Sequence, residues 1–206
     1  MSLFLHPILQ QSFAVIDQEI GDHGFNAAEY AVVRRVIHST ADFEFAQLIR
    51  FSPNVIESAI AALQQKVPII TDVTMVKQGV TTVVNQTFGN PLISAVEQAP
   101  VALPGKTRTE TGILHCWQEF PQAIFVIGNA PTALLALCAE FPTAPVPPAL
   151  VIGAPVGFIA VLEAKAALIQ LSIPQICIQG RKGGSAVAAA ILNALLVLAW
   201  ESRTDR

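Results

Sequence analysis

The sequence is poor in charge and in the short motifs that usually indicate a function. Only 13% of the 206 residues are charged, and the formal net charge is -3. No run rich in lysine or arginine is present, which argues against a nucleic-acid-binding surface. The G-x-x-x-x-G-K-[ST] and G-x-G-x-x-G loops are both missing, so no motif indicates nucleotide binding. The G-x-S-x-G turn of α/β hydrolases is missing as well.

Cysteine is scarce too. Cys116, Cys138 and Cys177 lie far apart and form no C-x-x-C pair. This odd, scattered set, with a start that lacks the pattern of a signal peptide, predicts reduced thiols in a cytoplasmic protein. His115 adjoins Cys116, but no second ligand pair follows at a zinc-like spacing, so we expect no metal site.

Apolar residues, in contrast, are abundant. They make up 52% of the chain, which favours a sheet buried on both faces, a large subunit interface, or both. The most apolar run, "AVAAAILNALLVLAW", has about 15 residues, whereas a bilayer span needs roughly 20. We therefore expect a buried or interface helix there and no membrane contact. The length suits one domain over residues 1–206.

The second half of the chain has a regular rhythm. The segments "AIFVIGNAPTALLALCAEF", "ALVIGAPVGFIAVLEAKAALIQL" and "PQICIQGRKGGSAVAAAILNALLVLAW" each read as strand, glycine turn and helix. Because the strands are apolar throughout, they indicate a parallel sheet covered on both faces. In the first half we expect helices near 7–20, 27–39 and 54–65, a strand in "VPIITD" and another in "VTTVVNQ". The prediction is a three-layer α/β/α domain with a mainly parallel sheet of about five strands.

Ligands of open parallel sheets bind outside the carboxyl ends of the strands. Of the segments at these strand ends, "GRKGGS" has the features most typical of a ligand-binding turn. Gly183 and Gly184 let the backbone approach a ligand, and Ser185 is suited to cap the next helix. A helix start of this kind binds anions, and Arg181 and Lys182 add positive charge. An ordinary strand-to-helix turn remains the alternative.

Two further polar residues follow predicted strands. Asn129 in "IGNAP" offers a donor and an acceptor at the same sheet edge, although the segment also fits a plain turn. Asp72 follows "VPIIT" and is either an acid or ligand contact or the N-cap of the next helix.

The stretch "AVVRRVIHST" concentrates charge beside valines. If it is helical, His38 lies one turn after Arg34 and Arg35 on the same side. Two guanidinium groups disfavour protonation of the imidazole, whereas a bound polycarboxylate favours it. Such a histidine can exchange a proton near neutral pH, although a capping or surface histidine is the alternative.

Several blocks together resemble the precorrin-8X methylmutase family, which includes cobalt-precorrin-8 methylmutases. They are "SFAVIDQEI", "AVVRRVIHST", "FEFAQLIRFSP", "IITDVTMVKQGV", "VIGNAPTALLAL", "VIGAPVGFIAVLEAKAAL" and "GRKGGSAVAAAILNALL", spread from about residue 5 to residue 199. The resemblance implies a flavodoxin-like fold, a homodimer and a role in cobalamin biosynthesis. It implies an isomerase that moves a methyl group from ring carbon 11 to carbon 12, formally a [1,5]-sigmatropic shift, giving hydrogenobyrinate or cobyrinate.

The resemblance also implies roles for particular residues. His38 matches the acid–base histidine, Arg35 the arginine before it, Ser12 a substrate contact, and Arg108 an arginine of a "TRS"-like segment. The substrate carries several carboxylates, for which we expect a set of cations: Arg34, Arg35, Lys77, Arg108, Arg181 and Lys182. The reaction needs neither a redox cofactor nor a protein-bound metal, since a proton placed by one histidine suffices.

Two other classes of function stay open at this point. One is a non-catalytic tetrapyrrole or corrin carrier with the same pocket, in which His38 only ligates or hydrogen-bonds. The other is a flavin- or nucleotide-binding module on the same fold. Against the latter, the first clear strand is followed by "TDVTMV" and not by a phosphate-binding loop.

Overall fold

The structure, a computed structural model, describes residues 6–204. The domain predicted for 1–206 also includes residues 1–5 and 205–206, which lie outside the described part. One six-stranded sheet forms the centre. Its strands are β1 (Ile49–Phe51), β2 (Ile69–Thr71), β3 (Leu92–Ser94), β4 (Ile124–Ile127), β5 (Leu150–Gly153) and β6 (Gln175–Ile178).

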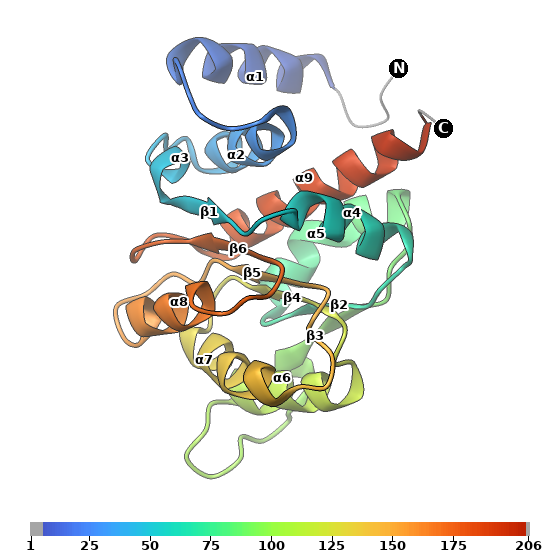
Figure 1. The fold of residues 1–206 in the computed structure, drawn as a ribbon, viewed down its shortest axis with the longest axis vertical. Coiled ribbons are helices and arrows are strands. Elements are labelled where there is room, and N and C mark those ends of the chain that lie inside the picture. Colours follow the sequence, from blue (N-terminus) through green and yellow to red (C-terminus); the bar gives the residue numbers. More distant parts are fainter. Residues whose placement is uncertain (1–5, 205–206) are drawn as a thin grey trace.

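Helices cover both faces of this sheet (Figure 1). The α-helices are α1 (Pro7–Glu19), α2 (Ala27–Thr40), α3 (Phe45–Leu48), α4 (Val55–Gln64), α5 (Thr74–Gln86), α6 (Arg108–Glu119), α7 (Pro131–Glu140), α8 (Val161–Ile169) and α9 (Ser185–Thr204). Two short 3-10 helices are η1 (Ala95–Gln98) and η2 (Phe141–Thr143).

The strand order is β1-β6-β5-β4-β2-β3. The last five strands are parallel, and β1 pairs antiparallel with β6 at one edge. Numbered along the chain, the parallel strands follow the order 2-1-3-4-5 of flavodoxin-like sheets, with the switch point between β2 and β4. The predicted α/β class and mainly parallel sheet are confirmed, and the antiparallel edge strand is an addition to them.

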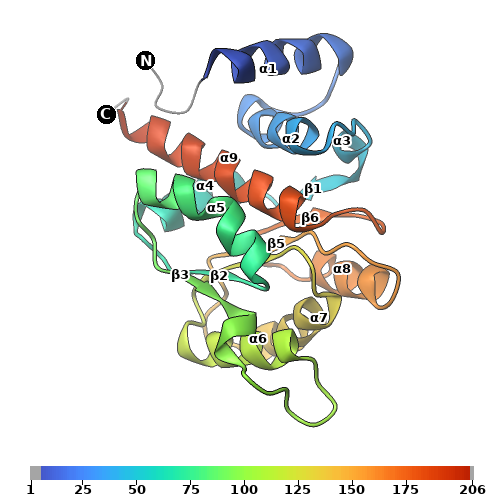
Figure 2. The same cartoon turned by 180° about the vertical axis from the view of Figure 1, so that it is seen from behind.

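Alternate residues of each strand face two separate cores. In β4, Ile124 and Val126 join the core under α2, α4, α5 and α9, whereas Phe125 and Ile127 join the core under α6, α7 and α8. Both sets are fully buried, as expected for a parallel sheet covered on both faces. Figures 1 and 2 show these two helical layers on opposite sides of the sheet, with α1 lying outside α2.

The predicted helices at 7–20, 27–39 and 54–65 and the strand in "VPIITD" are confirmed. The strand predicted in "VTTVVNQ" is wrong, because this segment belongs to α5. Its β-branched residues favour a strand locally. Burial of Val76, Val80 and Val84 at four-residue spacing against the core outweighs that preference.

Helix α9 is longer than the apolar run in the sequence suggested. It has 20 residues, so by length and composition alone it could cross a membrane, and the prediction that it is too short was wrong. It packs against α2, α4 and α5 over the sheet, and 56% of its apolar window is buried inside the protein. These contacts are those expected of a helix in the core of a folded domain.

Candidate functional site

His38 lies near the end of α2, and the sequence of this helix fixes its direction. Asn26 and Glu29 form a capping box at the start, and Ala41 ends the helix in the left-handed conformation. The apolar face made of Val32, Val33, Val36 and Ile37 is buried against the core. His38 therefore faces outward, and its ring meets the Phe13 ring edge-on, with ring centroids 5.6 Å apart.

Helix α1 is attached to α2 mainly through polar and aromatic contacts. Ile16 is its single buried residue. Asp17 accepts hydrogen bonds from Tyr30 and from Arg34, and the Arg34 guanidinium lies 4.3 Å from the centre of the Phe13 ring. This network places Leu9, Ser12 and Phe13 over the end of α2. Burial and the hydrogen bond to Asp17 raise the pKa of Tyr30 to about 12.

A groove of about 480 Å³ runs from His38 along α9, between α1 and α5. It is lined by Leu9, Arg35, His38, Ser39, Gly79, Ala186, Ala189, Ala190 and Asn193. On the other side of α1 a second hollow, of about 390 Å³, contains Ser12 and again His38. His38 is thus shared by two hollows: Arg35 lines one of them with it, and Ser12 lines the other.

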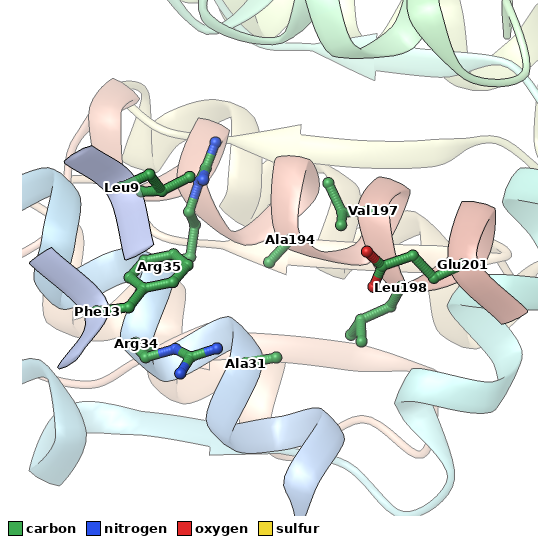
Figure 3. A pocket seen from close by; sticks show the side chains of 9 residues that line it. All are labelled: Leu9, Phe13, Ala31, Arg34, Arg35, Ala194, Val197, Leu198 and Glu201. Carbon is green, nitrogen blue, oxygen red and sulfur yellow. The ribbon is translucent and has the colours of Figure 1, made fainter. Parts of the chain in front are cut away.

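Arg34 and Arg35 differ although they are neighbours. The Arg34 guanidinium is paired with the Asp17 carboxylate at 3.0 Å. Arg35 is half-buried, and among the residues that the structure describes it forms no ion pair or hydrogen bond. Both line a smaller pocket against α9, where Figure 3 shows their guanidinium groups pointing apart. Arg35 is therefore the arginine left to hold an anionic ligand.

The titration of His38 reflects this arrangement. Burial lowers the pKa of His38, and the positive charge of Arg35 lowers it further. Burial also lowers the pKa of Arg35. Both effects favour the neutral imidazole, and an anion bound to Arg35 would remove part of that bias.

Three of the predicted cations are occupied elsewhere. Lys77 pairs with Glu97 at 2.8 Å, and Lys182 pairs with Asp42 and Glu44 at 2.6 and 2.7 Å. These contacts raise the pKa of Lys182. Arg108 donates to the carbonyl oxygens of Val96 and Ala99, each at 3.0 Å, and so fastens the segment before α6.

None of these three side chains lines the hollows that contain His38. Arg181 is exposed, and its guanidinium lies 5.8 Å from the centre of the Phe158 ring. Of the six predicted rim cations, the structure thus brings only Arg35 beside His38 in an unpaired state.

The glycine turn before α9 lies at the far end of the groove. Gly184 donates its N–H to the carbonyl of Ala154 at 2.8 Å, and a Cβ atom at Gly183 would clash with that same oxygen. The glycines therefore allow the turn before α9 to pack closely against the backbone that follows β5, at Ala154. Helix α9 begins at Ser185, and the next residue, Ala186, already lines the groove.

The "IGNAP" turn after β4 is built differently. The backbone N–H groups of Gly128, Asn129 and Ala130 all donate to the carboxylate of Asp72, at 3.1, 2.6 and 2.8 Å. Asp72 is fully buried, and burial raises its pKa while these N–H groups lower it.

Asp72 thus occupies the backbone N–H donors of the turn after β4, beside the switch point, so this turn has none of these donors left for a phosphate. This argues against the flavin- or nucleotide-binding alternative. The Asn129 side chain is exposed and does not line the groove.

Sequence reasoning missed part of the groove. Ser39, Asn193 and Gly79 line it, and Asn193 donates to the carbonyl of Gly79 at 3.0 Å. A polar residue inside the most apolar helix was a usable signal for Asn193. Gly79 gives no such signal, because the β-branched residues that follow it in α5 favour a strand locally.

Fold and site together define a class of protein. It is a flavodoxin-like α/β protein in which Asp72 occupies the N–H donors of the turn after β4, and its groove offers an imidazole, an unpaired guanidinium and apolar walls. Within residues 6–204 no group of three or more metal-ligating side chains is assembled. The groove suits proton transfer on a large anionic ligand.

Comparison with known proteins identifies the family within this class. The precorrin-8X methylmutase family matches residues 7–198. A cobalt-precorrin-8 methylmutase of Synechocystis sp. is 54% identical over 95% of this chain and 96% of its own. A precorrin-8X methylmutase of Pseudomonas aeruginosa is 37% identical over 91% of this chain and 93% of its own.

A solved structure agrees. Precorrin-8X methyl mutase from Thermus thermophilus has a TM-score of 0.88 and 40% identity, covering 95% of this chain and 96% of its own. The chain belongs to the precorrin-8X methylmutase family and is an isomerase of that type. The resemblance seen in the sequence is thereby confirmed.

Proposed function

We propose that the protein moves a methyl group from carbon 11 to carbon 12 of cobalt-precorrin-8 or precorrin-8X, with His38 as the acid–base. The observation that carries this proposal is the outward-facing imidazole of His38 beside the unpaired Arg35 in one groove, where burial and Arg35 lower the pKa of His38. A [1,5] methyl shift needs no nucleophile and no change of oxidation state. It needs a proton on the ring system and a ring held in a reactive shape.

The proposed sequence of events starts with a carboxylate of the macrocycle binding Arg35. Its negative charge offsets the guanidinium, so the pKa of His38 rises and the imidazole takes up a proton. The imidazolium donates this proton to the macrocycle, the bond to the migrating methyl group becomes electron-poor, and the group shifts. His38 then takes a proton back from the ring, and when the product leaves, the pKa of His38 falls again and the imidazolium releases its proton to solvent, which restores the neutral imidazole.

General acid–base catalysis of this kind contributes about 10²–10⁴-fold. The remainder comes from orientation of the macrocycle. The groove beside α9 supports this role, since Ala186, Ala189 and Ala190 form a smooth apolar wall opposite Arg35. Its volume, about 480 Å³, falls in the range of roughly 300–1,000 Å³ that is common for small-molecule sites.

Ser12 and Ser39 flank His38 on its two sides and are proposed as further substrate contacts. We propose the cobalt form as the natural substrate, because the Synechocystis relative at 54% identity bears that name. The metal would then arrive with the substrate.

The homodimer and the cytoplasmic location stay predictions. Large apolar side chains support the former: Phe158 and Ile159 are 82% and 84% exposed, and Met75 is 71% exposed. Such groups suit burial by a second copy of the chain. Light scattering of the purified protein tests this, and a monomer mass at micromolar concentration would contradict it.

The function is tested by mixing purified protein with cobalt-precorrin-8 or with precorrin-8X and following the visible spectrum. Wild type should convert one of them to the corrin chromophore, and His38→Ala should lose about 10²–10⁴-fold in kcat while still binding product. His115→Ala is the matched control, because that histidine is exposed on α6 away from the groove. It should behave as wild type.

Other outcomes point elsewhere. If wild type binds both macrocycles without converting either, the carrier alternative holds. If His38→Ala converts as fast as wild type, the acid–base assignment is wrong.

A further inference from the structure

Lys165, on α8, is a buried cation that the proposed chemistry does not use. Only 2% of its surface is exposed. Its ammonium donates to the carbonyl oxygens of Gly180 and Lys182, at 2.8 and 2.7 Å, and no carboxylate pairs with it within residues 6–204. A buried charge without a counterion is costly, and an apolar side chain of the same size often stabilises a protein more. Packing alone therefore does not account for a lysine here.

The two carbonyls belong to the turn between β6 and α9. Gly180, Gly183 and Gly184 have φ values of 74°, 153° and 123°, which only glycine adopts easily. Such a path turns carbonyl oxygens inward, where they need donors. Helix α8 lies on the face of the sheet opposite to α9 (Figures 1 and 2). The Lys165 side chain on α8 nevertheless contacts the turn that leads into α9.

The turn has two connections to the groove of His38. It leads directly into α9, whose residue Ala186 lines the groove. In addition, the Lys182 side chain bridges to Asp42 and Glu44, in the connection that follows α2. The backbone that Lys165 holds thus links both sides of the groove, the start of α9 and the end of α2.

We propose that Lys165 is a positioning residue of the methylmutase reaction, which holds the β6–α9 turn so that α9 and the Lys182 bridge keep the groove in its reactive shape. This inference rests on the proposed function. Lys165 touches neither His38 nor the groove and acts only through the turn. Its burial also lowers the pKa of Lys165 to about 8, which fits an ammonium held by carbonyl dipoles alone.

The test compares Lys165→Met with Lys66→Met, which removes an exposed lysine after α4. Turnover of precorrin-8X or its cobalt form and binding of the corrin product are measured on the same folded preparations. We expect Lys165→Met to lower kcat by at least about tenfold with less than a threefold change in product Kd, and Lys66→Met to match wild type. Equal losses in kcat and binding, following the folded fraction, would mean that Lys165 only stabilises the fold.

A second variant keeps the test decisive if Lys165→Met fails to fold. Lys182→Met breaks the bridge to Asp42 and Glu44 at the surface, without touching a core. It should lower kcat severalfold with unchanged thermal stability and product affinity, and wild-type kcat in this variant would overturn the proposed coupling. If wild type itself converts neither substrate, the proposed function fails instead, and the two failures are therefore distinct.

Discussion

The turns after β4 and β6 look alike in sequence and are stabilised by opposite charges. After β4, the buried carboxylate of Asp72 accepts hydrogen bonds from three backbone N–H groups of the turn. After β6, the buried ammonium of Lys165 donates hydrogen bonds to two backbone carbonyl oxygens of the turn. Both turns join a strand to a helix at the same edge of the sheet, but only the turn after β6 contains glycines with positive φ, at Gly180, Gly183 and Gly184.

The difference decides what each turn can still bind. The donors after β4 already hold an anion that belongs to the chain, so this turn is closed to ligand anions. After β6 the carbonyls are satisfied from within, and helix α9 starts beside the groove with Ala186 on its wall. The groove proposed for the ligand lies away from this turn, among α1, α2, α5 and α9.

The largest effect is expected from removing the anion after β4. Asp72→Ala leaves three turn N–H groups without an acceptor in a buried place, and we expect it to lower the free energy of unfolding by about 3–5 kcal/mol. Urea unfolding at neutral pH measures this. Asp72→Asn keeps an acceptor oxygen and should lose less. Asp22→Ala, at an exposed site, is the control.

The vacated position gives a second readout. In Asp72→Ala, formate should restore stability in a concentration-dependent way, because it matches the removed carboxylate in size and charge and can accept from the freed N–H groups. Wild type should show no such gain. A loss below about 1 kcal/mol in the alanine variant would contradict the role assigned to Asp72.

The second effect concerns the cation after β6. The pKa of Lys165 is about 8 in the folded chain, against an ordinary value of 10.5. Between these pH values the unfolded chain binds a proton that the folded chain does not, so the free energy of unfolding rises with pH. The gain from pH 8 to pH 10.5 is at most about 3 kcal/mol.

Urea unfolding of wild type and Lys165→Met across this range isolates the effect, because other groups cancel in the difference. A thiolate at Cys177 would raise the pKa of Lys165. The Cys177 thiol stays protonated across this range, because burial raises its pKa to about 12. A difference that does not change with pH would mean that the ammonium is not desolvated in the folded protein.

The third effect compares two glycines of the same turn. Gly183→Ala places a Cβ atom against the carbonyl of Ala154 at a φ of 153°, and strain of this kind costs about 1–3 kcal/mol before the clash is counted. Gly180→Ala meets open space and costs about 1–2 kcal/mol for its left-handed φ alone. Thermal unfolding should rank Gly183→Ala as the less stable variant. The reverse order would contradict the close packing of this turn against Ala154.

Much of the fold could be predicted from the sequence, because strand–glycine–helix rhythm and apolar strands are local signals. The helix α5 was partly hidden, since Thr81, Thr82, Val83 and Val84 favour a strand until the core is known. The antiparallel strand β1 has only three residues and depends on its pairing with β6. Such pairing has no signature within the segment itself.

The site could be predicted in part. His38 and Arg35 stood out because one helical turn joins them, and Ser12 followed from the resemblance. Residue type alone cannot tell which cations are free, because their partners lie far away in the chain: Lys182 pairs with residues about 140 positions earlier. The same holds for Asp72, because three of its four N–H donors lie beyond residue 127.

The smallest effect is expected at Asn129, and it separates backbone from side chain in the turn after β4. Asn129 gives its backbone N–H to Asp72, while its exposed side chain makes no hydrogen bond within residues 6–204. Asn129→Ala keeps the backbone donor, so the free energy of unfolding should change by less than about 0.5 kcal/mol. Product affinity should also stay at the wild-type value, as measured by titration of the corrin spectrum. A severalfold loss of affinity would show that this turn contacts the macrocycle after all, and the contrast between the two turns would then hold for stability but not for binding.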